Sequence, residues 1–393
     1  MYVMVGTASI LAVLTMLALL WVTLGARSRG RQELAVTEHP DCPLPDRHER
    51  PVICFMYYTF QMVGFSKADL PTHLCRSVVL CCLNSTSQEA VNLAVRQGLE
   101  LKSHMKRAVT YIGVGGPWLD YAEADGWLQS EESMKRPLEI IDAVIWEGGY
   151  NGGAALWVPD WLKLTQRSKL DGFSFNLLVK LNRLKGSSLL LFLPQNTSAA
   201  VSLFSAETLE MPHLIPVMPS HIMHWNKKGL NFMTCSSPNR AAGFVTGAVN
   251  VSLEGTYSSL KQAFSEIWTD IGTRMIFTFS LSWMHFVQQD PQNRSAGAPG
   301  EYRATIAYGN VCKKRLGVHR RSFRDFLTDC QIISDGGADW YSGVGEEASD
   351  FLRFHKDVKG IMIFDVDFDD FNGTCRDFKY PQLHALHDFF LML

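Results

Sequence analysis

The sequence predicts an α/β fold in which eight parallel strands, each followed by a helix, close into a (β/α)8 barrel. From residue 51 onward, short β-branched or aromatic runs alternate with longer helix-like stretches, which is typical of repeated βα units. This region also exceeds the ~250 residues that such a barrel usually needs. The runs with strand character are Val52–Tyr58, Ser77–Leu83, Ala108–Gly113, Gly172–Phe175, Leu189–Leu193, Ile215–Met218, Met275–Phe279 and Gly360–Val366.

The N-terminal region has a different character. Val3–Ala26 carries no charge, and a helix of this length, rising ~1.5 Å per residue, would cross a hydrocarbon layer of ~30 Å. We therefore expect residues 1–26 to be an uncleaved signal-anchor, with a signal peptide cleaved near Gly25-Ala26 as the alternative. Residues 27–50 are polar and without apolar periodicity, so they are predicted to be an exposed stem before a folded domain at 51–393.

The signals that bear on cellular location conflict. Arg27, Arg29 and Arg31 follow the apolar segment, and positive charge tends to stay on the cytoplasmic side. Nine cysteines favour an oxidising compartment instead, and long domains translocate largely regardless of flanking charge. We expect an extracellular or lumenal protein, with glycosylation at the Asn-x-Ser/Thr sequons of Asn84, Asn196, Asn250, Asn293 and Asn372.

The net charge restricts the possible partners, and one long connection between strands bears on the domain organisation. The net charge of −2 and a pI near 6.6 give no basic surface for phosphate, so nucleic-acid partners are excluded. The stretch between the seventh and eighth predicted strands far exceeds the ~2–6 residues usual for a loop in such folds. We expect an inserted subdomain there, at about residues 284–340.

Several segments resemble the chitinases and chitinase-like proteins of glycoside hydrolase family 18, in family order along nearly all of the domain. VICFMYY and DLPTHLC resemble the first strand and the approach to the second. YIGVGGPW resembles the Ser-x-Gly-Gly-Trp segment of strand three, with Gly113 in place of Ser and Pro117 displacing Trp118 by one position. GAPGEYRATIAYGNVC resembles the α+β insertion, and GIMIFDVDFDDFNGTC the eighth strand. The resemblance implies disulfides Cys54–Cys75 and Cys312–Cys375.

The resemblance also implies where catalysis would occur. In active members strand four ends in Asp-x-x-Asp-x-Asp-x-Glu, and alternation along the strand directs the last three acids into the barrel mouth. The segment LDGFSFNLLVK places Asp171, Ser174, Asn176 and Leu178 at these positions. Leucine cannot donate a proton, so the general acid, commonly worth ~10²–10⁴ in rate, is missing. The sequence therefore predicts a degenerate enzyme.

Other strand ends depart from the family too. The Met-x-Tyr-Asp of strand six aligns with Met218, Pro219, Ser220 and His221, so both Tyr and Asp are lost. Phe364 replaces the Trp that floors a sugar subsite, which leaves a smaller apolar platform. The predicted ligand-binding residues are Phe55, Trp118, Asp171, Asn176 and Phe364; ordinary packing at the barrel mouth is the alternative.

We expect neither the remaining cysteines nor the acidic run to hold a metal or a cofactor. Cys42, Cys81, Cys82, Cys235 and Cys330 form an odd set, which predicts a free thiol or an intermolecular bridge, most simply at Cys42. Cys81 and Cys82 are neighbours on one strand and should face opposite sides. Alternating carboxylates could bind Ca²⁺ or Mg²⁺, but capping or loop anchoring is the preferred role. That run comprises Asp365, Asp367, Asp369 and Asp370.

Three classes of function remain. The leading hypothesis is a catalytically inactive chitinase-like protein that binds chitooligosaccharides or other N-acetylglucosamine-containing glycans at the barrel mouth. A second is a signalling or structural protein that uses the barrel for contacts with a protein receptor. The third, less favoured, is a weak hydrolase whose acid has moved to Glu147, Asp171 or Asp365.

Overall fold

The structure is a computed structural model in which Arg47–Leu393 forms one compact unit. It describes residues 51–58, 64–115, 121–156, 167–182, 188–191, 193–194, 204–218, 261–290, 299–315, 321–325, 330–334, 339–343 and 360–392. The predicted signal-anchor and stem lie outside these residues. No helix in the part of the chain that the structure describes combines the length and apolar character needed to cross a membrane.

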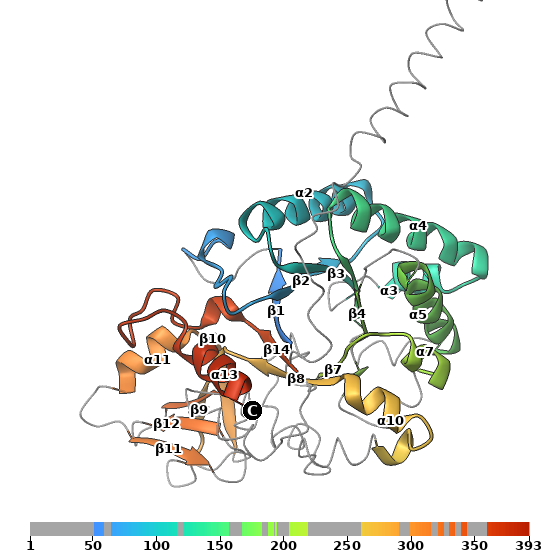
Figure 1. Cartoon of the computed structure of the whole chain (residues 1–393). Coiled ribbons are helices and arrows are strands. Elements are labelled where there is room, and N and C mark those ends of the chain that lie inside the picture. The colour runs from blue at the N-terminus through green and yellow to red at the C-terminus, as the bar shows by residue number, and fades with distance from the viewer. Residues whose placement is uncertain are drawn as a thin grey trace, which may run out of the picture. The chain divides into compact units, whose positions relative to one another are not determined.

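A parallel sheet forms the centre of the fold, with strand order β5-β4-β3-β2-β1-β14-β8-β7-β6 (Figure 1). Its two end strands, β5 and β6, are separated in sequence by a single residue, so they are two halves of one strand and the sheet closes on itself. The eight-stranded (β/α)8 barrel is thereby confirmed. The strands are β1 (Val52–Tyr57), β2 (Ser77–Leu83), β3 (Val109–Gly115), β4 (Gly152–Leu156), β5 (Ser188–Leu191), β6 (Leu193–Pro194), β7 (Ile215–Met218), β8 (Met275–Ser280) and β14 (Ile361–Phe364).

Helices surround this sheet on the outside (Figure 1). Ser87 and Ser130 begin the two longest of them, and each side chain accepts a hydrogen bond from a backbone N–H of the first turn, as helix N-caps do. The helices are α2 (Gln88–His104), α3 (Tyr121–Trp127), α4 (Glu131–Glu147), α5 (Arg167–Asn182), α7 (Ala206–Glu210), α10 (Trp268–Ile271) and α13 (Pro381–Met392), with short 3-10 turns at η1 (Lys67–Asp69), η5 (Gly272–Arg274) and η7 (Val366–Phe368).

The predicted strands match the observed barrel strands to within a few residues, with one exception. The segment Gly172–Phe175 is not a strand but lies within α5. Phe173 and Leu177, four residues apart, are buried, whereas Phe175 between them is 37% exposed. This is the period of a helix, because in a strand all three side chains would share one face. The fourth strand is β4, which precedes α5.

In its described residues, the insertion between barrel strands seven and eight consists of an antiparallel sheet and a helix, as predicted. Its strand order is β10-β9-β13-β12-β11, and its core packs Trp283, Tyr308 and Tyr341. The Trp283 indole N–H donates to Gln382 Oε1 at 2.9 Å, which ties the insertion to α13 of the barrel. Its elements are β9 (Trp283–Gln288), β10 (Gly300–Ile306), α11 (Tyr308–Arg315), β11 (Arg321–Asp325), β12 (Cys330–Ser334) and β13 (Asp339–Gly343).

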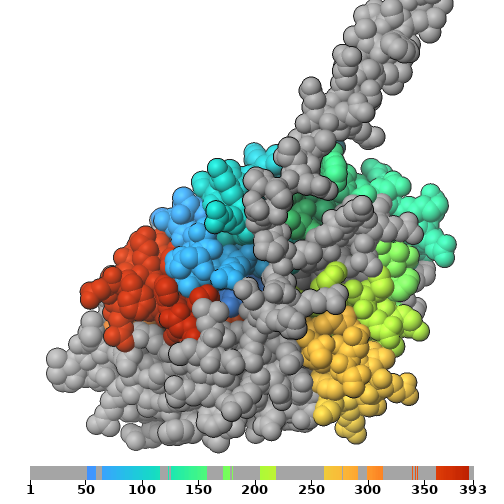
Figure 2. Space-filling model, in the orientation of Figure 1, coloured from blue at the N-terminus to red at the C-terminus, as the bar shows by residue number. Residues whose placement is uncertain are grey.

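The first and last parts of the barrel lie side by side, as the adjoining blue and red surfaces in Figure 2 show. The rings of Phe65 and Phe371 pack edge to face at 5.1 Å between centroids. The Tyr380 hydroxyl donates to the carbonyl oxygen of Asp69. These contacts join the segment after β1 to the segment after β14, the two strands that pair where the chain begins and ends its circuit of the barrel.

Both predicted disulfides are formed, with Cα–Cα distances of 5.5 Å for Cys54–Cys75 and 5.7 Å for Cys312–Cys375. The prediction that Cys81 and Cys82 face opposite sides is wrong. Their Cα atoms lie 3.0 Å apart across a cis peptide bond, which brings the two side chains to the same side of the strand. The alternation rule failed here because it assumes trans peptides throughout the strand. Cys42 and Cys235 lie outside the described residues.

Candidate functional site

Three aromatic side chains form a cluster that we call the aromatic floor: Phe55 and Tyr57 on β1 and Phe364 on β14. The rings of Phe55 and Phe364 stack at 4.2 Å between centroids with an interplanar angle of 24°, and Tyr57 packs edge-on against Phe55 at 5.3 Å. Cys54, on the opposite face of β1, is bridged to the crossover outside the barrel, so alternation directs Phe55 and Tyr57 inward. The floor thus lies at the carboxyl ends of neighbouring strands, where barrels of this type carry their sites.

A carboxylate stands beside this floor. Asp365 follows β14 directly, in a left-handed backbone conformation with φ of 57° that is uncommon for a non-glycine residue. Its Oδ2 accepts hydrogen bonds from the hydroxyls of Ser280, at 2.5 Å, and Ser282, at 3.0 Å. The side chain is only partly exposed. Two hydroxyls at the end of β8 therefore fix the position of this carboxylate.

Besides burial, the charge of Asp365 also raises the pKa of two tyrosines. Burial raises the pKa of Tyr57 well above its usual value, and the negative charges of Asp365 and Asp367 raise it further. Burial likewise raises the pKa of Tyr302, on β10 of the insertion, and Asp365 adds to this effect. Both phenols are therefore neutral at physiological pH and can donate hydrogen bonds. The carboxylate thus lies near side chains from the barrel and from the insertion.

Asp369 and Asp370, the last two aspartates of the acidic run, stabilise the fold through hydrogen bonds with the backbone. Asp369 is buried and accepts hydrogen bonds from the backbone N–H groups of Asp370 and Leu383, while Asp370 accepts from the N–H of Cys375. Asp369 therefore satisfies the first turn of α13, in the manner of a helix cap. Within the residues that the structure describes, no group of three or more His, Cys, Asp or Glu side chains is arranged to hold a metal ion.

The residues predicted at the catalytic positions do not reach the barrel mouth. Asp171, Ser174, Asn176 and Leu178 all belong to α5, in the outer helical layer. Asp171 Oδ1 accepts a hydrogen bond from the backbone N–H of Ser205, the residue that caps α7, at 3.0 Å. Ser174 is buried and Asn176 is exposed. The placement of the acid motif at 171–178 is therefore wrong, as is the inclusion of Asp171 and Asn176 among sugar contacts.

Some of the remaining predicted site residues lie within the described part of the chain and others lie outside it. Phe55 and Phe364 meet in the aromatic floor, as described above. Trp118 and the strand-six residues Pro219, Ser220 and His221 lie outside the described residues. Of the sequons, Asn84 is partly exposed and Asn372 is exposed, and the other three lie outside the described residues.

Solved structures with this architecture are chitinases and chitinase-like proteins. A group IV chitinase from Ostrinia furnacalis superposes with a TM-score of 0.69 at 16% identity, over 87% of this chain and 100% of that one. An immunomodulatory active chitinase from Trichuris suis gives 0.69 at 12% identity, over 87% and 100%. Human YKL-39, described as a pseudo-chitinase with retained chitooligosaccharide binding properties, gives 0.69 at 12% identity, over 86% and 99%. The fold is that of the family 18 chitinases.

No family model matches the sequence, and no curated protein resembles it at the level of sequence. The chitinase fold nevertheless explains why the segments recognised in the sequence occur in family order. It also fixes which strand corresponds to strand four of the chitinases, because β4 pairs with β3 on one side and β5 on the other.

On β4, the family's acid motif falls on different residues from those predicted. With its last three positions on one strand face and its end just past the strand, the motif aligns with Asn151, Ala154, Leu156 and Val158. In this register Val158 occupies the glutamate position, and the nearest carboxyl residue after it in the sequence is Asp160, two positions further on. The signal that could have located the strand is the Gly-Gly pair followed by a short apolar run, which lacks the β-branched residues that usually mark strands.

Proposed function

We propose that this protein binds chitooligosaccharides, or other glycans that contain N-acetylglucosamine, at the mouth of its barrel and does not cleave them. The observation that carries the proposal is the stacked Phe55 and Phe364 pair with the Asp365 carboxylate beside it. The two rings are each 1% exposed and form the apolar base of the mouth beneath the ligand, while the fixed carboxylate accepts hydrogen bonds from sugar hydroxyls. The retained chitooligosaccharide binding of the YKL-39 pseudo-chitinase, which shares the fold, supports this choice of ligand.

The expected absence of cleavage follows from the residues at the end of β4. A general acid must lie within hydrogen-bond reach of the leaving oxygen, and the family places it at the end of this strand. Here the whole segment from Gly148 to Pro159 is without a carboxyl group. Val158, at the glutamate position of the alignment, has no proton to donate. A carboxyl group at another position, either Asp160 two residues further along or an acid on another strand, would have to take over the role.

Relocation of the acid finds little support in the geometry. Glu147 is the last residue of α4, which leads into the start of β4, so it lies at the face of the barrel opposite the mouth. Asp171 is engaged with the N-cap of α7. Asp365 does lie at a strand end, but it accepts hydrogen bonds from two serine hydroxyls. We assign it to ligand recognition, as an acceptor.

We also propose an extracellular or lumenal location. The Cys54–Cys75 and Cys312–Cys375 bridges persist in oxidising compartments, and the sequon asparagine Asn372 is exposed at the surface. Attachment to a membrane through residues 1–26 remains a prediction from the sequence. Treatment with a peptide-N-glycosidase of the protein secreted by, or retained in, mammalian cells should lower its apparent mass; an unchanged mass would contradict glycosylation.

Isothermal titration with tetra-N-acetylchitotetraose tests the proposal for the mouth. We expect saturable binding by the wild type and at least about tenfold weaker binding by Asp365→Asn, since a hydrogen bond to a charged group contributes ~1.5–3 kcal/mol. Asp377→Asn is the matched control, because Asp377 is exposed and lies outside the aromatic floor. Failure of the wild type to saturate even at millimolar ligand would contradict the proposal and favour the alternative, a barrel that serves contacts with a protein receptor.

A further inference from the structure

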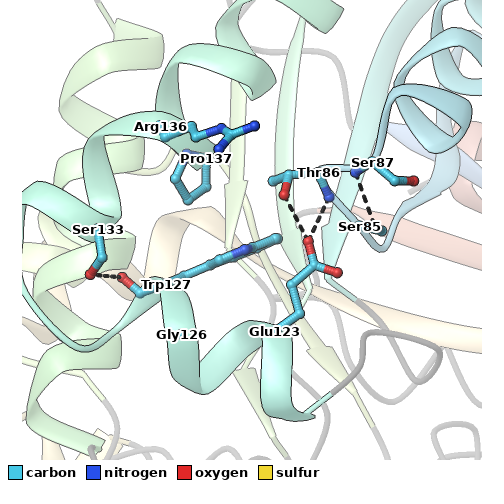
Figure 3. Close-up of a pocket in the computed structure, with 9 residues that line it drawn as sticks. All are labelled: Ser85, Thr86, Ser87, Glu123, Gly126, Trp127, Ser133, Arg136 and Pro137. Carbon is cyan, nitrogen blue, oxygen red and sulfur yellow. Dashed lines mark hydrogen bonds between the residues drawn. The ribbon is translucent and has the colours of Figure 1, made fainter.

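A cavity lies between the beginning of α2 and the helices α3 and α4 (Figure 3). Its volume is about 540 Å³, within the ~300–1,000 Å³ typical of small-molecule sites. The hydroxyl residues Ser85, Thr86 and Ser87 line one side, Glu123 and Trp127 come from α3, and Arg136 comes from α4. None of these belongs to the aromatic floor, so the cavity is a separate feature of the fold.

The polar groups of the cavity provide both a hydrogen-bond acceptor and donors. Glu123 Oε1 accepts the N–H of Thr86 at 2.6 Å and its hydroxyl at 2.8 Å, while Oε2 has no hydrogen bond among the described residues. Arg136 is exposed and extends over the cavity toward Thr86 (Figure 3), and it forms no ion pair with any residue that the structure describes. The carboxylate of Glu123, as an acceptor, and the guanidinium of Arg136, as a donor, thus remain available to a ligand.

These charges indicate the class of ligand. An anion would meet Glu123, and a cation would meet Arg136, so neither is favoured over a neutral molecule. A neutral molecule with several hydroxyl groups could donate to the carboxylate and accept from the guanidinium at the same time. Trp127 supplies an apolar surface at the base, and Phe173 stacks behind it at 5.8 Å between centroids. We propose that this cavity binds one or two rings of a neutral sugar.

The chain itself carries a candidate source of that sugar. Asn84 is a sequon asparagine, it is partly exposed, and the three residues that follow it line the cavity. The first rings of a glycan on Asn84 would be tethered beside the cavity, which raises their effective concentration to the millimolar range without any new contact. A free glycan would present the same chemistry, so the attached and the free sugar must be distinguished by experiment.

Hydrogen exchange of the folded full chain, read locally, tests the site. We would compare peptides covering residues 84–88 and 121–137 in the glycosylated wild type and in Asn84→Gln, without and with N,N'-diacetylchitobiose. Bound sugar should slow exchange in these peptides, by about tenfold when free sugar is at about ten times its Kd. Slowing in the glycosylated protein alone identifies the attached glycan as the occupant, and slowing of Asn84→Gln by added sugar identifies a free glycan.

Arg136→Gln should abolish either form of protection, because it removes the free donor of the cavity. Lys135→Gln is the matched control: it removes the same charge one residue away, where Lys135 pairs with exposed Glu132. A peptide over β1 should exchange equally in all variants, which shows that they are folded. The proposal is overturned if neither sugar slows exchange in the cavity peptides, or if Arg136→Gln leaves the slowing intact.

Discussion

Phe55 and Phe364 stack on each other at 4.2 Å although they come from the first and the last strand of the barrel. The pairing of β1 with β14, in the register Cys54 to Ile363, brings the next residue of each strand together at the inner face. The contact therefore closes the circuit of the chain and forms the apolar part of the proposed sugar site. Stability and binding depend on the same two rings, so experiments must separate the two effects.

Truncation of this pair should destabilise the fold. Phe364 is 1% exposed, and Phe364→Ala should lower the free energy of unfolding by ~3–5 kcal/mol, since it removes a buried ring and leaves a cavity. Phe378→Ala, which truncates a ring that is 50% exposed, should cost about 1 kcal/mol or less. Urea unfolding followed by circular dichroism measures both. Equal losses would contradict the assignment of Phe364 to the core.

Neutralising Asp365 should separate binding from stability. Asparagine tolerates the left-handed backbone at this position and keeps an acceptor oxygen for Ser280 and Ser282, so Asp365→Asn should change the free energy of unfolding by less than ~1 kcal/mol. Asp365→Val, by contrast, places a β-branched residue at positive φ and should be destabilising by ~1–3 kcal/mol. Thermal unfolding of the two variants tests this; similar melting temperatures would show that the backbone conformation does not matter.

Replacement of Gly98 by alanine should be destabilising, although this substitution normally stabilises helices. Replacing an interior helix glycine by alanine gains ~1 kcal/mol where space allows. A Cβ at Gly98, in α2, would lie 2.6 Å from the ring of Tyr150, whereas one at Gly172, in α5, would meet nothing within 4 Å. We expect Gly98→Ala to lower the melting temperature and Gly172→Ala to raise it. An increase for both would mean that the Tyr150 ring and the Gly148 carbonyl oxygen, 2.7 Å from the added Cβ, both move aside at no cost.

Asp369 should make stability depend on pH. Burial raises the pKa of its carboxyl from 3.8 to about 6, against the lowering effect of its hydrogen bonds with Leu383, Asp370 and Gln382. Because the folded state holds the proton more tightly than the unfolded state, the stabilising contribution is fully present below pH 3.8 and is lost as the pH rises through about 6. The span corresponds to about 3 kcal/mol.

Asp369→Asn should remove this contribution and flatten the profile over that interval. Urea unfolding of wild type and variant from about pH 4 to about pH 7 gives the comparison. Asp377→Asn, at an exposed position, serves as the control that should leave the wild-type slope unchanged. A variant profile parallel to that of the wild type would assign the pH dependence to other groups.

Chitinase activity should be absent. With no carboxyl group from Gly148 to Pro159, the wild type should not release the fluorophore from a 4-methylumbelliferyl chitobioside at acid or neutral pH. Turnover by the wild type that Asp365→Asn abolishes would instead make Asp365 a relocated acid. Attempts to restore catalysis belong at Ala154, Leu156 and Val158, since acids introduced on α5 would lie in the outer helical layer.

The sequence by itself determined the barrel, the insertion and most of the strands. Segments such as Ser77–Leu83 are continuous runs of buried, largely β-branched or apolar residues, and a strand enclosed between two layers needs such a run. The insertion followed from an excess of chain between two strands. The Cys54–Cys75 and Cys312–Cys375 bridges came from resemblance rather than from spacing, since pairing depends on distances in space.

Tertiary structure decided the identity of the fourth strand. It thereby decided which residues stand at the positions of the family's catalytic acids. Gly152–Leu156 has little intrinsic preference for a strand, and only pairing with β3 and β5 on its two sides makes it one. The segment around Phe175 alternates over too few residues to distinguish strand from helix, and burial of Phe173 and Leu177 against the barrel selects the helix. Asp365 gained its role in the same way, because the serine hydroxyls that hold it come from the last residue of the neighbouring strand β8 and from Ser282 just after it.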